Sequence, residues 1–146
     1  QNLGAERPDH AEISGTIAKR LALLVMSSMG IVFFIIPRPL VRIFSNDPEV
    51  IELAAVCLRI VAVSQPALAV WMVLAGGLRG AGDTRAIMKM VTVGFLLVRL
   101  GLAYLLAIVL DYGLIGAWIA MGVDLFFRGF MINRRFKAGQ WKAVKI

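Results

Sequence analysis

Three charged side chains lie inside long apolar stretches of this sequence: Arg99, Asp124 and Arg128. Arg99 lies 12 residues before Asp111, and Asp124 lies 12 residues after Tyr112. If a tight turn joins two antiparallel helices here, Arg99 and Asp124 both lie about 18 Å from the turn, at 1.5 Å per residue. Because a lone charge in an apolar medium is costly, the spacing predicts that these two residues pair. Arg128, one helical turn beyond Asp124 on the same face, is a rival or second partner.

Two interpretations of this charged set are open. In the structural interpretation, a buried ion pair holds two helices in register. In the functional interpretation, Asp124 takes up a proton when the pair opens, and the set forms a proton or substrate relay.

A second polar group, Ser64-Gln65-Pro66, interrupts another apolar stretch. Pro66 removes a helical hydrogen bond and clashes with the preceding turn, which predicts a kink. Ser64 or Gln65 can satisfy the carbonyl groups that a kink frees, and Gln65 is a candidate for lining a polar cavity. All three residues are therefore candidates for a substrate pathway. Trp71 lies six residues after Gln65 and not on the same narrow face, so we expect it to pack in the interior or contact lipid.

The segment GGLRGAGDTR, at residues 76–85, combines spaced glycines with basic residues. A phosphate-binding loop is one interpretation, but the GxxxxGK[ST] motif is absent and no strand is predicted before the segment. The pattern favours a tight turn followed by a helix that Asp83 or Thr84 caps.

Elements of membrane length must position these groups. The 146 residues are 60% hydrophobic and 17% charged, with a mean hydropathy of +0.82, whereas a soluble domain has roughly 25% charged residues. The apolar residues form runs long enough to cross a bilayer as helices. We predict an all-α, polytopic membrane protein with four spans, at about 17–36, 53–78, 87–110 and 114–132.

Polar segments precede and follow the spans. Residues 1–16 predict an aqueous connector, and residues 133–146 form a basic tail in which Phe136 and Trp141 suit the lipid headgroup region. The chain begins with Gln1 rather than Met, and we expect it to be a piece of a longer protein.

Basic residues are distributed unevenly about the predicted spans. Eleven lie on one side of the membrane, against two, Arg38 and Arg42, on the other. The eleven are Arg7, Lys19, Arg20, Arg79, Arg85, Lys89, Arg134, Arg135, Lys137, Lys142 and Lys145. Since cytoplasmic loops carry an excess of Lys and Arg, both ends of the chain and the 76–85 segment are expected in the cytoplasm, with the protein in the cell (inner) membrane.

The net charge of +7 would suggest nucleic-acid binding in a soluble protein. Here the basic residues lie mainly at the ends of apolar runs, where lipid headgroups explain them, so membrane lipid is an expected partner and nucleic acid is not. Cys57 and His10 are the only residues of their kinds. Because no metal-ligand set or nucleophile–base pair can be assembled, we expect no metal, no cofactor and no enzyme activity.

Five segments follow one another in a specific order and spacing. They are QNLGAERPDHA, the run from LRI to QPALA, LRGAGDTR, RLGLAYLLA and GLIGAWIAMGVDLFFRG. Together they resemble the C-terminal lobe of multidrug and toxic compound extrusion (MATE) transporters over essentially the whole chain. The resemblance implies that the four spans are helices nine to twelve of a twelve-helix protein built from two six-helix lobes.

The resemblance also implies a function: export of small organic, often cationic, compounds by antiport with protons or sodium ions, together with the missing N-terminal lobe. It aligns Leu68 with a position where some branches carry a cation-coupling Asp. This implies the branch whose coupling carboxylate lies in the N-terminal lobe. Two alternatives remain: a lipid-linked sugar flippase of the same wider superfamily, and a self-contained four-helix membrane protein that acts by oligomerising.

Overall fold

The structure is a computed structural model that describes residues 7–143, and these residues contain no strand. The elements in chain order are α1 (Pro8–Ile35), α2 (Pro37–Arg42), α3 (Pro48–Gly80), α4 (Thr84–Val93), η1 (Gly94–Arg99), α5 (Leu100–Ala103), η2 (Tyr104–Val109), α6 (Gly113–Lys137) and η3 (Gln140–Ala143). Of these, η1 and η2 are π-helical, and η3 is a 3₁₀ helix.

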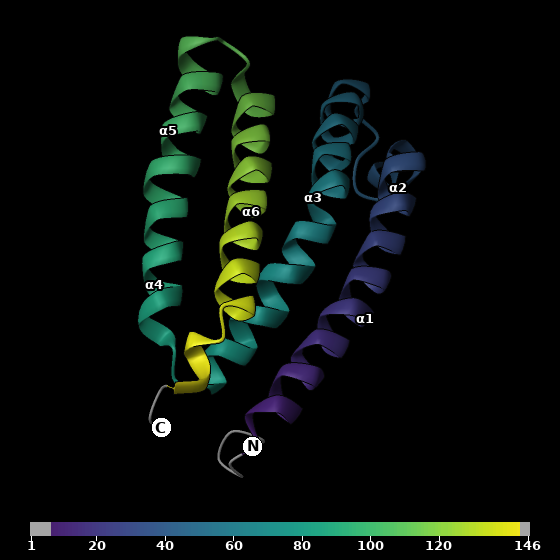
Figure 1. The fold of residues 1–146 in the computed structure, drawn as a ribbon. Helices are drawn as coiled ribbons and strands as arrows, with labels where there is room; N and C mark the ends of the chain where they lie inside the picture. Colours follow the sequence, from purple (N-terminus) through teal and green to yellow (C-terminus); the bar gives the residue numbers. More distant parts are fainter. Residues whose placement is uncertain (1–6, 144–146) are drawn as a thin grey trace.

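Four helical segments among the described residues have the length and hydropathy to cross a membrane: Pro8–Ile35, Pro48–Gly80, Thr84–Val109 and Gly113–Lys137. This finding confirms the prediction of an all-α, polytopic fold. Figure 1 shows the four segments running in alternating directions. The start of α1, the α3–α4 connection and η3 therefore lie together, at what we call the basic end, and α2 and the turn before α6 lie at the opposite end.

Prolines mark the starts of three helices. Pro8, Pro37 and Pro48 each occupy a first-turn position, where the missing backbone N–H leaves no helical hydrogen bond unmade. Asp47 caps α3 by accepting a hydrogen bond of 2.9 Å from the backbone N–H of Glu49. Because α1 begins at Pro8, residues 8–16 of the predicted connector form its first turns.

Helices α3 and α6 lie at the centre of the described fold. Within the most apolar window of each segment, 39% of the α3 residues and 33% of the α6 residues are buried, against 6% for α1 and 6% for the 84–109 segment. Helix α1 packs on one side of α3, and the 84–109 segment packs along α6 (Figure 1). The outer two segments therefore turn most of their apolar side chains away from the described residues.

Glycines allow the central helices to approach their neighbours closely. A Cβ atom at Gly30 of α1 would lie 2.7 Å from the carbonyl oxygen of Ala62 in α3, and one at Gly129 of α6 would lie 3.0 Å from that of Ala67. Small residues at such crossings let backbones pack directly, as is common in membrane helix pairs.

The tail after α6 folds back onto the basic end. The Trp141 ring stacks on Phe136 with 5.3 Å between centroids, and its indole N–H donates to the Phe136 carbonyl at 2.9 Å. Trp141 is only 3% exposed. The prediction that Trp141 lies among lipid headgroups is therefore wrong, because stacking on Phe136 turns its ring into the protein.

Candidate functional site

The buried charges lie together on α6. Asp124 is 0% exposed, and its Oδ2 accepts a hydrogen bond from a terminal nitrogen of the Arg128 guanidinium. The two residues are four positions apart, so they lie on the same helical face one turn from each other. The expected second partner, Arg128, is thus the residue that pairs with Asp124.

The pair leaves two polar atoms without hydrogen bonds. Asp124 Oδ1 and Arg128 Nε are buried, and neither has a hydrogen-bond partner among the described residues. The neighbour of this carboxylate is Gly94 of η1, where a Cβ atom would lie 2.6 Å from Asp124 Oδ1. Since buried polar groups in folded proteins are normally paired, this half-satisfied carboxylate is a candidate for binding a proton or another ligand.

Trp71 of α3 completes the cluster. The Arg128 guanidinium carbon lies 5.1 Å from the centroid of the Trp71 ring, and Trp71 is 8% exposed. This is a cation–π contact, which holds the Arg128 charge even without its carboxylate partner. The sequence interpretation of Trp71 as packing or lipid contact missed this role, because Trp71 and Arg128 meet only through the α3–α6 interface.

Arg99 does not reach this cluster. Among the described residues it forms no ion pair, and its guanidinium carbon lies 5.7 Å from the ring centroid of Phe95 on its own helix. The expected Arg99–Asp124 pair is therefore not formed in the structure. Whether these charges act in scaffolding or in a relay stays a prediction.

The π-helical segments explain the changed register. Gly94 faces Asp124, while the backbone of Leu106 faces Gly116. A stretch of 12 residues, 94–106, thus matches a stretch of only 8, 116–124. The i→i+5 bonding of η1 and η2 winds more residues into each turn and advances less per residue than an α-helix. Counting 1.5 Å per residue from the turn therefore selects the wrong residue, five positions beyond Gly94.

The Ser64-Gln65-Pro66 group spreads over different surfaces of α3. Ser64 is buried against Gly122 of α6 and donates to the Ile60 carbonyl at 2.9 Å. Gln65 is 7% exposed and packs against Gly30 of α1. Of the three, only Pro66 lines cavities that the structure describes.

Pro66 lies in the middle of α3, where the helix bends in Figure 1. It borders one cavity of about 360 Å³ between α1, α3 and α6, and another of about 410 Å³ between α1 and α3. At the first cavity, the Lys19 ammonium donates to the Asn133 side chain at 3.1 Å. Sequence reasoning missed this contact, because the two residues are 114 positions apart and neither interrupts an apolar run.

The glycine-rich segment forms the turn between α3 and α4. Gly82 has φ +79°, a left-handed conformation that glycine adopts at little cost. Asp83 occupies the N-cap position of α4 but makes no capping hydrogen bond. Its carboxylate instead accepts hydrogen bonds from Arg135 Nε at 2.9 Å and Nη2 at 3.2 Å. The predicted side-chain cap is therefore wrong, because Arg135 takes up the carboxylate of Asp83.

Four membrane-length helices around a buried charge pair define an integral membrane protein of the polytopic, all-α class. Residues 1–105 match the family model described as MatE. The chain belongs to the MATE family.

Several relatives are named as transporters or resistance proteins. The chain is similar to the "Probable multidrug resistance protein NorM" of Thermotoga maritima, with 35% identity over 84% of the chain. It is also similar to the "Multidrug resistance protein MdtK" of Photorhabdus laumondii, with 30% identity over 90% of the chain, and to the "Uncharacterized transporter YisQ" of Bacillus subtilis, with 28% identity over 82%. The matched region is 26%, 28% and 26% of these relatives, so the chain spans about a quarter of their length.

Proposed function

We propose that this chain supplies the last four helices of a twelve-helix multidrug efflux transporter. The observation that carries the proposal is the similarity, over 84% and 90% of the chain, to proteins named as multidrug resistance proteins. The transporter exports small organic, often cationic, compounds by antiport with protons or sodium ions. The N-terminal lobe is its partner within the same protein, and the outward-facing apolar side chains of α1 and the 84–109 segment suit contact with further helices or lipid.

For coupling, we propose that Asp124 takes up the proton. The carboxylate is fully buried, pairs only with Arg128 among the described residues, and has one free acceptor oxygen. Protonation at Oδ1 converts the carboxylate into a neutral acid and weakens its attraction for Arg128. The Trp71 ring retains the guanidinium, so the pair can open without leaving the arginine unsupported.

For the substrate, we propose the cavity beside Pro66. Apolar side chains, including Leu23, Val70 and Phe126, line most of it, which suits the apolar body of an organic compound. Lys19 and Asn133 lie at its edge, so their hydrogen bond is a candidate closure toward the basic end.

The coupling proposal is tested in the whole transporter that contains this segment, expressed in cells lacking other efflux pumps. Asp124→Asn keeps the size of the side chain but cannot gain a net charge or lose a proton. We expect lost drug efflux with normal membrane insertion and normal yield. Asp111→Asn is the matched control, because Asp111 is exposed, lies in the turn before α6 and has a positive φ that Asn also tolerates.

Efflux that persists in Asp124→Asn contradicts the coupling proposal. Failure of this variant to insert or fold supports the scaffold interpretation instead. Efflux measured under an imposed proton gradient, and separately under a sodium gradient, identifies the coupling ion. Loss of drug resistance on deleting the whole gene tests the transport proposal independently of Asp124.

The proposed orientation has the basic end in the cytoplasm of a cell with the transporter in its inner membrane. Arg79→Cys lies at the end of α3 at the basic end, and Tyr112→Cys lies in the opposite turn; both native residues are exposed. In intact cells, a membrane-impermeant maleimide is expected to label Tyr112→Cys but not Arg79→Cys. The reverse pattern contradicts the orientation.

A further inference from the structure

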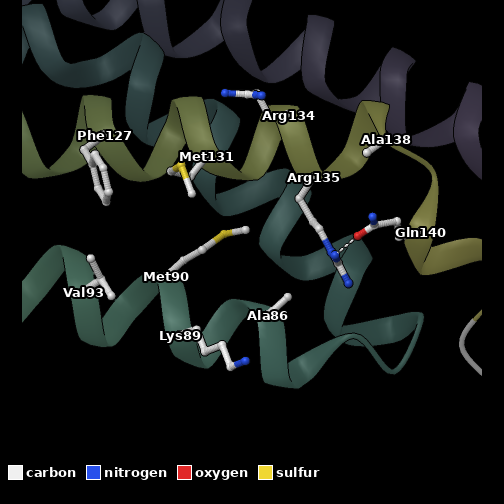
Figure 2. A pocket seen from close by; sticks show the side chains of 10 residues that line it. All are labelled: Ala86, Lys89, Met90, Val93, Phe127, Met131, Arg134, Arg135, Ala138 and Gln140. Atoms are coloured by element: carbon white, nitrogen blue, oxygen red, sulfur yellow. Dashed lines mark hydrogen bonds between the residues drawn. The ribbon is translucent and has the colours of Figure 1, made fainter.

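A groove of about 530 Å³ runs between α4 and the last turns of α6. Figure 2 shows Met90 and Val93 projecting into it from α4, and Phe127 and Met131 from α6. In each pair the residues are three or four positions apart, so each helix presents one face to the groove. The floor of the groove is therefore apolar.

Basic side chains gather at the outer part of the same groove. Lys89 lies on the α4 edge and Arg134 on the α6 edge, with Arg135 between the helices (Figure 2). Arg135 is neutralised by Asp83. Lys89 and Arg134 form no ion pair among the described residues, and the residues lining the groove include no acid. Two positive charges are thus left without a negative partner.

The position of these charges along the helices gives the groove a direction. Arg134 and Arg135 belong to the last turn of α6, and Lys89 lies in the second turn of α4, so the cations are near the membrane boundary. Val93 and Phe127 lie farther along their helices, toward the bilayer interior. The groove therefore changes from cationic at the boundary to apolar inside, which is the polarity that complements an anionic lipid.

We propose that this groove binds one anionic phospholipid. Its phosphate lies between Lys89 and Arg134, and an acyl chain extends along Met90, Val93 and Phe127. The charges favour this occupant over a zwitterionic lipid, because basic pockets between membrane helices attract anionic headgroups. They also disfavour a covering apolar helix, which would bury two unpaired cations at a large desolvation cost. Free phosphate would leave the apolar floor unfilled.

Lipid binding is measured on the whole purified transporter in an uncharged detergent. Native mass spectrometry counts retained lipid after addition of phosphatidylglycerol, phosphatidylcholine or glycerol phosphate. We expect the wild-type protein to retain one phosphatidylglycerol preferentially and no glycerol phosphate. Lys89→Gln/Arg134→Gln is expected to bind phosphatidylglycerol about 30-fold more weakly, since it loses two cations at the lipid surface.

The matched control is Arg79→Gln/Lys137→Gln. It removes the same charge from the same end of the molecule, at exposed residues outside the groove, so we expect wild-type lipid binding. Equal loss in both double variants contradicts the proposal, because it indicates only general attraction between a basic surface and an anionic lipid. Equal retention of phosphatidylcholine by the wild-type protein also overturns it, and retention of glycerol phosphate replaces the lipid with a free phosphate ligand.

A second measurement tests occupation of the apolar floor. Met131→Trp introduces a fluorophore into the groove, whose quenching is compared with that of the wild-type protein in brominated lipids. Stronger extra quenching by brominated phosphatidylglycerol than by brominated phosphatidylcholine is the expected result. Absence of extra quenching in either lipid overturns the proposal, because it means that protein rather than lipid covers the groove.

Discussion

Gly94 lies directly against the carboxylate of Asp124: a Cβ atom added to this glycine would lie 2.6 Å from Oδ1 and 2.8 Å from Arg128 Cγ. The backbone of a π-helical segment thus forms one wall around the buried ion pair. Space for the pair depends on the absence of a side chain at this one position.

Gly94→Ala is expected to destabilise the protein by about 1–3 kcal/mol, because the added methyl group overpacks the Asp124–Arg128 cluster. The measurement is denaturant unfolding in mixed micelles. Gly101→Ala is the control, since no atom lies within 4 Å of a Cβ there; we expect it to be neutral or slightly stabilising, as Gly to Ala usually is in a helix. Equal effects of the two substitutions would contradict the packing argument.

The Asp124–Arg128 pair predicts strong coupling between substitutions. Asp124→Asn and Arg128→Gln are each expected to cost roughly 3–5 kcal/mol of unfolding free energy, because each leaves an uncompensated buried group. The double variant is expected to cost clearly less than the sum of the two, since it removes both charges together. Unfolding of all four proteins under one condition completes the cycle, and additive costs would show that the residues do not interact.

Asp83 and Arg135 predict a link between the α3–α4 turn and the end of α6. The Asp83 side chain is 6% exposed, and losing a charged hydrogen bond of this kind costs about 1.5–3 kcal/mol. We therefore expect Asp83→Asn to raise hydrogen exchange at the backbone of residues 81–83 without changing exchange in the turn before α6. Asp111→Asn, in that turn, provides the comparison. Unchanged exchange at residues 81–83 would mean that the turn is held by its backbone hydrogen bonds alone.

Lys142 predicts a pH dependence at the basic end. Its ammonium contacts the carboxylates of Glu12 and Asp9, and the hydrogen bond to Glu12 raises the pKa of Lys142 above its ordinary value of 10.5. Because the folded-state pKa is raised, this contact stabilises the fold fully below pH 10.5 and loses its effect as the pH rises through the folded pKa.

The expected difference in thermal midpoint between the wild-type protein and Lys142→Gln is thus constant from neutral pH to about pH 10 and shrinks above it. Lys137→Gln, which removes an exposed cation that forms no ion pair among the described residues, is expected to show no such trend. A difference that grows at high pH would have the wrong sign for this contact.

The helical, four-span architecture follows from the sequence itself. Long apolar runs can satisfy their backbone hydrogen bonds in a bilayer only within helices, and the prolines and Asp47 at the helix starts are local signals. The MATE resemblance likewise depended on ordered segments, and the family match confirms it. These features depend on neighbours in the chain, so no knowledge of the packing was needed.

Only the tertiary structure decided which charges meet. Arg99 and Asp124 are equally spaced from the turn, yet the π-helical segments shorten one helix and bring Gly94, not Arg99, to Asp124. Likewise, the Trp71 contact with Arg128 depends on how α3 crosses α6. Helical rise and crossing angles come from packing of side chains distant in the sequence, so residue spacing alone predicts that buried charges need partners but does not identify them.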